Sequence, residues 1–245
     1  MRKFILFFSV ISLSVFLNSC LGEGGNSFSE DSIGYITTDY STGLTYARTL
    51  TGRFITSSEI KAMSPGTFHY FVYSWEESYG AAYIGDGYYT VYNVISTSDT
   101  EIGKKEVFPY EAPTDENQIP LASTTQFQAI NDLYGTYMDD YWIVGYGYKI
   151  KKGEVVSASF YAPAIDQSSS TATEVVIDIR LTKSGTAETT TETSESNIIA
   201  LNMSQIRNRY ITSSTKTMNV KFRFYVDGQT DPYTTAAYQM ASYDE

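Results

Sequence analysis

The sequence predicts an all-β protein, with a small N-terminal barrel or sheet, one short helix and a C-terminal β-sandwich. Aromatic residues make up 15% of the 245-residue chain, including 22 Tyr and 13 Phe, and such residues fit the pleated surface of a strand. From Ile33 onward, apolar residues alternate with polar ones or form short runs between turn signals. A hydrophobic share of 42% is ample for a packed core, so we expect one large or two small domains.

The chain begins with the pattern of a bacterial lipoprotein signal peptide. Two basic residues precede a largely apolar run, Phe4 to Phe16, which is long enough for export and shorter than the roughly 20 residues of a membrane span. The following Leu17-Asn18-Ser19-Cys20 resembles a lipobox, in which the cysteine is acylated and becomes the mature N-terminus. We therefore expect residues 1–19 to be removed and Cys20 to carry more than one acyl chain, as stable anchoring requires. The alternative is an ordinary export signal with an incidental cysteine.

Residues 20–32 have the composition of a flexible tether, rich in Gly, Ser and acidic residues. The scattered acids behind Cys20 resemble the surface-export signals of Bacteroidetes lipoproteins, which favours the outer face of the outer membrane over its periplasmic face. Asp31-Ser32-Ile33 resembles the O-glycosylation sequon of the same phylum. Ser32 is therefore a candidate O-glycosylation site, and the alternative is that this segment is only a linker.

Residues 33–110 are predicted to form the small N-terminal β domain. The tight-turn signal Gly85-Asp86-Gly87 directly precedes a run of aromatic and β-branched residues. Four segments have the character of strands: Gly34–Thr38, Leu44–Ile55, Phe68–Trp75 and Tyr88–Ile95.

Residues 111–136 are predicted to be a linker that contains a short helix. Three prolines, separated by acidic residues, lie between Glu106 and Pro120, and each proline removes a donor from a strand ladder. A threonine N-cap and Gly135 bound the predicted helix Thr125–Tyr134. Its apolar residues have spacings of three and four, which is the period of a helix face: Phe127, Ile130 and Tyr134.

Residues 137–245 are predicted to form the C-terminal β-sandwich. Trp142–Ile150 and Val156–Ala162 alternate along their lengths and are joined by the turn Lys151–Glu154, which predicts a hairpin. A solvated loop is expected over Thr186–Glu195. The remaining strands are expected at Val175–Leu181, Asn197–Met203 and Val220–Val226.

The last of these strands carries the sharpest prediction. Phe222 and Phe224 share one face with two valines, so we expect them in the core. Lys221 and Arg223 lie on the opposite face and are expected to point toward water.

The order of these parts resembles the NigD-like lipoproteins of Bacteroidetes, which combine a lipobox, an acidic tether, a small β-barrel and an aromatic-rich β-sandwich. The stretches Asp86–Val91 (DGYYTV) and Asp140–Tyr146 (DYWIVGY) contribute to the resemblance. It implies an OB-like N-terminal domain and an immunoglobulin-like C-terminal domain. It also implies binding to another protein, since the family is named for a bacteriocin-operon product suggested to act in immunity. No enzymatic activity is established for the family.

The composition argues against catalysis, metal binding and nucleic-acid binding. The chain has one His and one Cys, whereas metal sites need several converging ligands and general-base catalysis most often uses His. His69 shares a strand face with Phe71 and Tyr73, so we expect it to be buried with a hydrogen-bond partner. A formal net charge of −11 would repel phosphate backbones. We therefore predict no catalytic residue, no metal, no cofactor and no nucleic-acid partner.

Trp75 and Tyr79 are the candidate ligand contacts. They flank Glu76-Glu77-Ser78, a predicted hairpin tip, and exposed rings beside carboxylates suit sugar rings; the alternative is packing within the sheet. Three function classes stay open: a lipid-anchored protein that binds another protein, a surface glycan-binding lipoprotein, and a fimbrial subunit. A fimbrial subunit would be cleaved behind its first strand, at Arg48 or Arg53.

Overall fold

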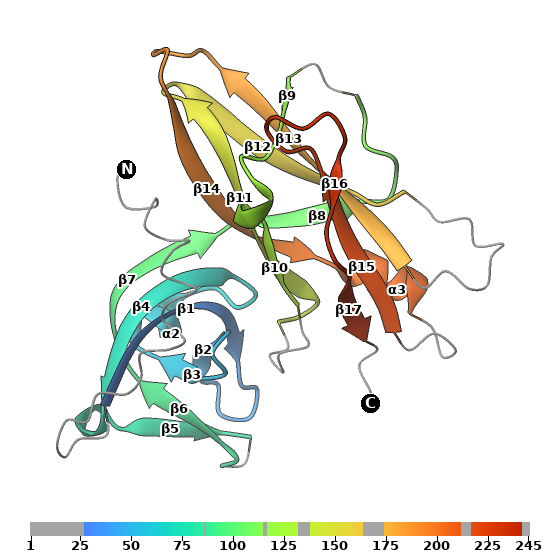
Figure 1. The fold of residues 1–245 in the computed structure, drawn as a ribbon. Helices are drawn as coiled ribbons and strands as arrows, with labels where there is room; N and C mark the ends of the chain where they lie inside the picture. The colour runs from blue at the N-terminus through green and yellow to red at the C-terminus, as the bar shows by residue number, and fades with distance from the viewer. Residues whose placement is uncertain are drawn as a thin grey trace. The chain divides into compact units, whose positions relative to one another are not determined.

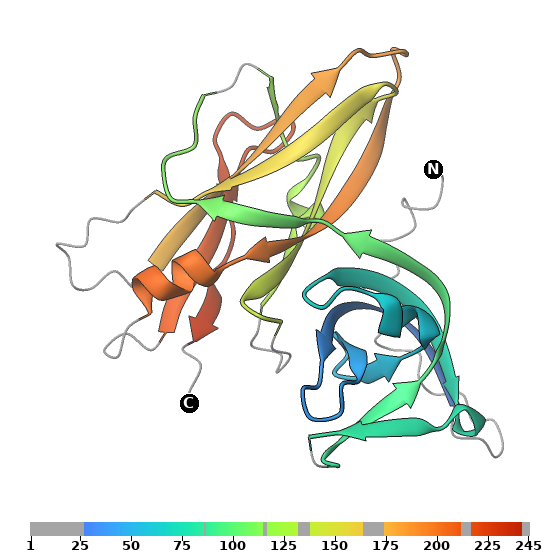
Figure 2. The ribbon, with the colours of Figure 1, turned by 180° about the vertical axis from the view of Figure 1, so that it is seen from behind.

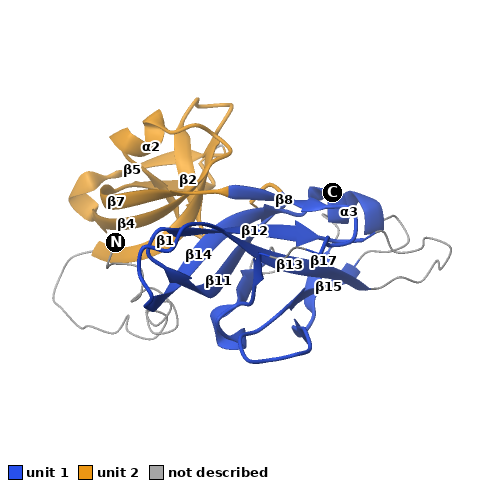
Figure 3. Ribbon diagram, turned by 90° about the horizontal axis from the view of Figure 1, so that it is seen from above, with its two compact units in different colours: residues 1–17, 104–133, 140–245 blue, residues 18–103, 134–139 orange. Residues whose placement is uncertain are grey.

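The computed structural model describes residues 27–85, 87–114, 117–131, 138–163, 174–211 and 217–241. It confirms the all-β class, with a barrel-like sheet and a sandwich in two compact units (Figure 3). The N-terminal unit ends at Gly103. The C-terminal unit runs from Lys104 onward, apart from residues 134–139. The predicted signal peptide and Cys20 lie outside the described residues.

The N-terminal unit is a seven-stranded sheet with the order β5-β6-β3-β2-β1-β4-β7, curled into a half-barrel around a short helix (Figure 1). Each of the four predicted strand segments overlaps a strand of this sheet, and the segment Leu44–Ile55 divides into β2 and β3. The elements are β1 (Ser27–Thr38), β2 (Thr45–Thr49), β3 (Phe54–Thr56), α2 (Ser58–Ala62), β4 (Phe68–Glu76), the 3-10 turn η2 (Glu77–Tyr79), β5 (Ala81–Ile84), β6 (Tyr89–Asn93) and β7 (Ile95–Ile102).

Strand β1 begins inside the segment predicted to be a tether, so that prediction is wrong over residues 27–32. These residues pair with β4, from Ser27 opposite Glu76 onward. The ring of Phe28 stacks on Trp75 with the ring centroids 5.4 Å apart. The composition of residues 20–32 is typical of a tether although it includes one aromatic residue, Phe28. The ring of Phe28 packs on Trp75, and the backbone of this segment pairs with β4, so the segment forms a strand.

Gly34 lies where the pairing of β1 with β2 begins and its pairing with β4 nears its end. A Cβ at this position would lie 3.0 Å from the ring of Phe71 and 3.1 Å from the Cβ of Ala47. Glycine therefore permits the close approach of neighbouring strands that curls the sheet. The core beneath it contains Ile36, Ala47, Ile55, Ile60, Phe71, Tyr73 and Val94.

The C-terminal unit is a two-layered sandwich whose layers are joined along one edge by β8. The first three residues of β8 pair with β14, and the last two pair with β12 (Figure 2). The elements are β8 (Lys104–Phe108), β9 (Gln118–Ile119), the 3-10 turn η3 (Thr124–Gln126), β10 (Gln128–Ile130), β11 (Tyr141–Lys151), β12 (Glu154–Tyr161), β13 (Glu174–Gly185), β14 (Glu192–Asn202), α3 (Ser204–Tyr210), β15 (Thr217–Phe224), β16 (Tyr233–Thr234) and β17 (Tyr238–Ala241).

The predicted hairpin between β11 and β12 is wrong, although both strands and the turn between them exist. β11 pairs with β10 and β14, whereas β12 pairs with β13 and β8. The two strands therefore belong to opposite layers, and β11 carries Trp142, whose ring lies 6.3 Å from Phe222 of β15. Alternation reveals which face of a strand is buried. It does not reveal whether two strands are hydrogen-bonded in one layer or pack face to face from opposite layers.

The helix predicted over Thr125–Tyr134 is also wrong in its described part, which consists of η3 followed by β10. Phe127 and Ala129 are both buried, which is the period of a strand. Phe127 packs on Phe222 and Phe224, with ring centroids 5.1 and 4.9 Å apart. Residues 132–137 lie outside the described part of the chain.

Much of the predicted linker, residues 111–136, is part of the C-terminal unit. Ile119 of β9 pairs with Leu181 of β13, and Leu121 is buried in the core. The predicted loop Thr186–Glu195 is shorter than expected, because β14 already begins at Glu192.

The predicted alternation of β15 is confirmed. Phe222 and Phe224 are fully buried, together with Val220 and Val226. Lys221 and Arg223 lie on the opposite face, where they form ion pairs with Glu174 and Asp178.

Candidate functional site

The outer face of β13 and β15 carries an uneven set of charges. The two strands run parallel, and Asp178 lies opposite Arg223 in the register. Both carboxylate oxygens of Asp178, a residue only 3% exposed, accept hydrogen bonds of 2.6 Å from Arg223, and these bonds raise the pKa of Arg223. Arg180 Nη2 lies 3.8 Å from the same carboxylate. One carboxylate therefore faces two guanidinium groups, and it is already engaged by one of them.

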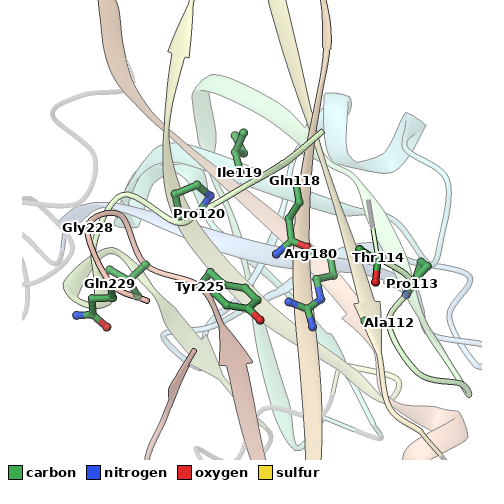
Figure 4. Close-up of a pocket in the computed structure, with 11 residues that line it drawn as sticks. Ala112, Pro113, Thr114, Gln118, Ile119, Pro120, Arg180, Tyr225, Gly228 and Gln229 are labelled. Carbon is green, nitrogen blue, oxygen red and sulfur yellow. The ribbon is translucent and has the colours of Figure 1, made fainter. Parts of the chain in front are cut away.

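Arg180 lines a pocket of about 390 Å³ at this face (Figure 4). Residues 112–114 and β9 form one side, and Tyr225 and the residues after it form the other. The guanidinium carbon of Arg180 lies 5.1 Å from the centroid of the Tyr225 ring, and Arg180 is the only charged residue among the described residues that line the pocket. Its Nε is buried and has no hydrogen-bond partner among the described residues.

Three aromatic rings lie beside this charge cluster on the same outer face. Tyr161 of β12 is opposite Asp178 in the register, and its ring packs with those of Phe108 and Tyr110 at centroid distances of 5.4 and 5.6 Å. Phe108 is 38% exposed and Tyr110 is 53% exposed. The pocket volume falls in the range of about 300–1,000 Å³ that is common for small-ligand sites, which typically combine apolar walls with a few polar groups.

Trp75 and Tyr79, the predicted ligand contacts, belong to the N-terminal unit, and both have partners inside it. The half-buried ring of Trp75 packs on Phe28 and lies 5.0 Å from the ring of Tyr92, while its Nε1 donates to the carbonyl of Gly80 at 3.1 Å. The Tyr79 hydroxyl donates to Glu76 at 2.8 Å, which raises the pKa of Tyr79. Packing within the sheet accounts for the ring of Trp75, whereas the Tyr79 side chain is held by its hydrogen bond to Glu76.

Ser32, the candidate O-glycosylation site, is only 6% exposed in the middle of β1. Its hydroxyl donates to the carbonyl of Ile33 at 3.4 Å. Modification of this hydroxyl would therefore have to precede folding. His69 is buried as expected, with its Nε2 3.1 Å from the Thr67 hydroxyl and its ring stacked on Phe71.

A second surface feature is a set of four exposed tyrosines in the N-terminal unit, which we name the tyrosine end: Tyr40, Tyr83, Tyr88 and Tyr89. They lie on the β1–β2 loop, on β5 and around the start of β6, and the register places Tyr83 and Tyr89 on different faces of the β5–β6 pair. Asp39 connects its parts, because its carboxylate accepts from the amides of Ser41 and Thr42 in its own loop and from the amide of Gly85 beyond β5. The hydrogen bonds from the Ser41 hydroxyl and the Thr42 amide hold the pKa of Asp39 well below its usual range.

Within the described residues, no three His, Cys, Asp or Glu side chains are grouped so that they could hold a metal ion. No helix in that part of the chain combines the length and apolar character of a membrane span.

The chain shares its fold with several solved structures from Bacteroidetes. An uncharacterised protein from Parabacteroides merdae matches with a TM-score of 0.55 and 12% identity, over 86% of this chain and 98% of that one. A candidate lipoprotein from Bacteroides fragilis matches with a TM-score of 0.54 and 13% identity, over 87% and 98%. A NigD-like immunity protein from Bacteroides caccae matches with a TM-score of 0.50 and 11% identity, over 87% and 97%. No protein-family profile and no curated protein matches the sequence.

These likenesses confirm that the chain shares its β fold with a NigD-like immunity protein, as the resemblance in the sequence implied. Sequence reasoning missed Arg180, Tyr225, Phe108 and Tyr110 as candidate site residues. The available signal was that Arg180 lies on the outer face of a predicted strand. Its meeting with Tyr225 depends on the parallel pairing of β13 with β15, and the linker-like segment before β9 gave no sign that it lines a pocket.

Proposed function

We propose that this chain is a non-catalytic lipoprotein of the Bacteroidetes cell envelope that binds another protein through the tyrosine end. Cys20 anchors it in the outer membrane, with the folded units on the cell surface. The observation that carries the proposal is the tyrosine end itself, on a fold shared with a NigD-like immunity protein and a candidate lipoprotein. In the immunity form of the proposal, the bound protein is a bacteriocin.

The tyrosine end has the properties of a protein-binding surface. Tyrosine is enriched at interfaces because it offers a large apolar ring together with a polar hydroxyl. Tyr88 is 85% exposed, whereas Tyr89 is held by packing against Phe54 at 5.3 Å. Tyr83 lies on β5, the edge strand of the sheet, whose outer backbone groups are able to pair with a strand of a partner.

The fimbrial alternative fits the fold poorly. Cleavage at Arg48 or Arg53 would remove β1, which lies inside the sheet between β2 and β4. Arg53 also contacts both Glu30 and the ring of Phe28, so it holds β1 in place. The glycan-binding alternative was based on Trp75 and Tyr79 and is better supported by the pocket at Arg180.

Site-specific photo-crosslinking tests the protein-binding proposal. Tyr88→benzoylphenylalanine is expressed as the full chain in Bacteroides cells grown with bacteriocin-producing strains. Tyr233→benzoylphenylalanine is the matched control, because Tyr233 is an exposed tyrosine of the C-terminal unit. We expect a discrete crosslinked protein from position 88 only, and its purified form should bind the wild type more tightly than Tyr88→Ala. Identical crosslinks from both positions, or none, would refute the proposal.

Protection of a sensitive strain tests the immunity form. Expression of the full chain should allow growth in the presence of one bacteriocin of a tested panel, and Tyr88→Ala combined with Tyr89→Ala should abolish protection. Tyr233→Ala should leave it intact. Crosslinking without any protection would show a protein-binding function other than immunity.

The anchor has its own prediction. Wild-type protein should fractionate with membranes, incorporate a fatty-acid probe and be accessible to protease on intact cells. Cys20→Ser should lose both the label and cleavage after Ser19, because Cys20 is the only thiol in the chain. Undiminished labelling of Cys20→Ser would contradict the lipobox assignment, and protection from protease would place the protein on the periplasmic side.

A further inference from the structure

We propose that the pocket at Arg180 is a binding site for acidic polysaccharide, in which Arg180 pairs with the carboxylate of a uronic acid. This site belongs to the C-terminal unit, and it is separate in residues and chemistry from the protein-binding surface proposed above.

The guanidinium of Arg180 has hydrogen-bonding capacity that its neighbours do not use. A guanidinium has five N–H donors and is always charged near neutral pH. Within the described residues, the Nε of Arg180 has no hydrogen-bond partner, and the one ion-pair contact of its guanidinium is the 3.8 Å approach to Asp178. Asp178 accepts two 2.6 Å hydrogen bonds from Arg223 instead. Arg180 is therefore equipped to take a second carboxylate, from a ligand.

The ring of Tyr225 orients the guanidinium of Arg180. The guanidinium lies over this ring, and both side chains are seen together at the pocket in Figure 4. Stacking on an aromatic ring limits the movement of the guanidinium plane and leaves its edge for a ligand. Arg180 is the single charge among the described residues that line the pocket, and a ligand carboxylate would balance it.

The groups around the Arg180 charge include neutral polar ones. Thr114, Gln118 and Gln229 line the same pocket with neutral hydroxyl and amide groups, which match the hydroxyls of a sugar. The exposed rings of Phe108 and Tyr110 lie on the same face and offer apolar surfaces on which the C–H groups of the next sugar can stack. An acidic peptide would use the charge but has little need for hydroxyl partners, so the combination favours a uronate polymer.

Isothermal titration calorimetry on the intact lipoprotein in detergent tests this inference. The probes are oligosaccharides of galacturonate, alginate and hyaluronate. Methyl-esterified oligogalacturonate is the matched ligand control, because it keeps the sugar and removes the charge. We expect at least one uronate oligosaccharide to bind and the ester not to bind.

Three variants locate the site. Arg180→Gln should weaken binding about tenfold or more, as expected when one partner of a charge pair is lost. Phe108→Ala should weaken it by a smaller factor of a few fold. Arg209→Gln is the matched control, because it removes an arginine of the same unit that does not line the pocket, and it should bind like the wild type.

Several results would overturn the proposal. These are no binding of any uronate, equal binding of the methyl ester, or equal loss in Arg180→Gln and Arg209→Gln. Polyglutamate tests whether the ligand is an acidic peptide. If polyglutamate bound as tightly as the uronates, the ligand would be an acidic peptide and not a glycan. If Arg180→Gln fails to fold in a thermal melt, Arg180→Lys serves instead, since it keeps the charge but loses the planar fork and should still bind more weakly.

Discussion

The two units of this protein build their cores in different ways. The C-terminal core is one continuous apolar cluster, to which the inward faces of both layers contribute. The described residues of the N-terminal unit include two smaller, separate clusters, and five of the nine buried polar residues identified in the described chain lie in this unit: Ser32, Thr49, Thr56, Ser57 and His69. The smaller unit therefore depends more on hydrogen bonds that must be satisfied locally.

Glu30 is at the centre of that dependence. It accepts a hydrogen bond from the buried hydroxyl of Tyr73, one of 2.7 Å from Thr51 and one of 3.2 Å from Arg53. These bonds join β1, β4 and the loop before β3. The C-terminal unit therefore rests mainly on one apolar cluster, whereas the N-terminal unit also requires particular polar side chains from its first strand.

Deletion of residues 27–32 should give the largest difference between the units. It removes six of the nine β1 residues that pair with β4, including Phe28 and Glu30. We expect the amides of β4 to lose protection from hydrogen exchange, while those of β11 and β13 keep it. Full protection of β4 in the shortened chain would show that these residues are a tether after all.

Phe222→Ala should have the largest effect of any single substitution on the C-terminal unit. Its fully buried ring contacts Phe127, Trp142 and Tyr238, so its loss should cost about 3 to 5 kcal/mol in chemical denaturation. The neighbouring Lys221→Ala is the control, and loss of its partly exposed ion pair with Glu174 should cost at most about 1 kcal/mol. Equal sensitivity of the two positions would contradict the core described here.

Tyr146 gives the C-terminal unit a predicted pH dependence. Burial raises the pKa of Tyr146 to about 12, from an ordinary value of 10.0. The unfolded chain therefore releases this proton first, and stability should fall as the pH rises from about 10 to about 12, by roughly 2 to 3 kcal/mol. Tyr146→Phe should remove that part of the loss in alkaline denaturation, and an unchanged profile would argue against burial of the hydroxyl.

Two tyrosines of the N-terminal unit should differ, although both donate to a glutamate. Tyr73→Phe leaves the buried side of Glu30 without its donor and should cost about 1 to 2 kcal/mol. Tyr79→Phe removes the bond to Glu76 at the surface and should leave the stability close to that of the wild type. A loss in Tyr79→Phe as large as that in Tyr73→Phe would remove the distinction between buried and surface hydrogen bonds in this unit.

The candidate sites also depend on contacts between residues that are far apart in the chain. The sequence pointed to Trp75 and Tyr79 because two rings flank a pair of acids, and it had no way to show that Phe28 covers Trp75 from a strand hidden in the tether-like segment. Arg180 and Tyr225 are 45 positions apart in the numbering, and nothing local marks either of them. Their contact exists because β13 and β15 pair in parallel.

Alternation along a strand is a local property with a period of two, so the amino-acid pattern was enough to predict the all-β class, the positions of most long strands and the two faces of β15. The pattern was not enough to place β11 and β12 in opposite layers, to form a strand rather than a helix over residues 128–130, or to begin β1 at Ser27, because these features depend on strand pairing and packing. The physical reason is the same in each case. Strand pairing and core packing join residues that are distant in the chain, and an apolar residue has the same signature in the sequence whichever partner buries it.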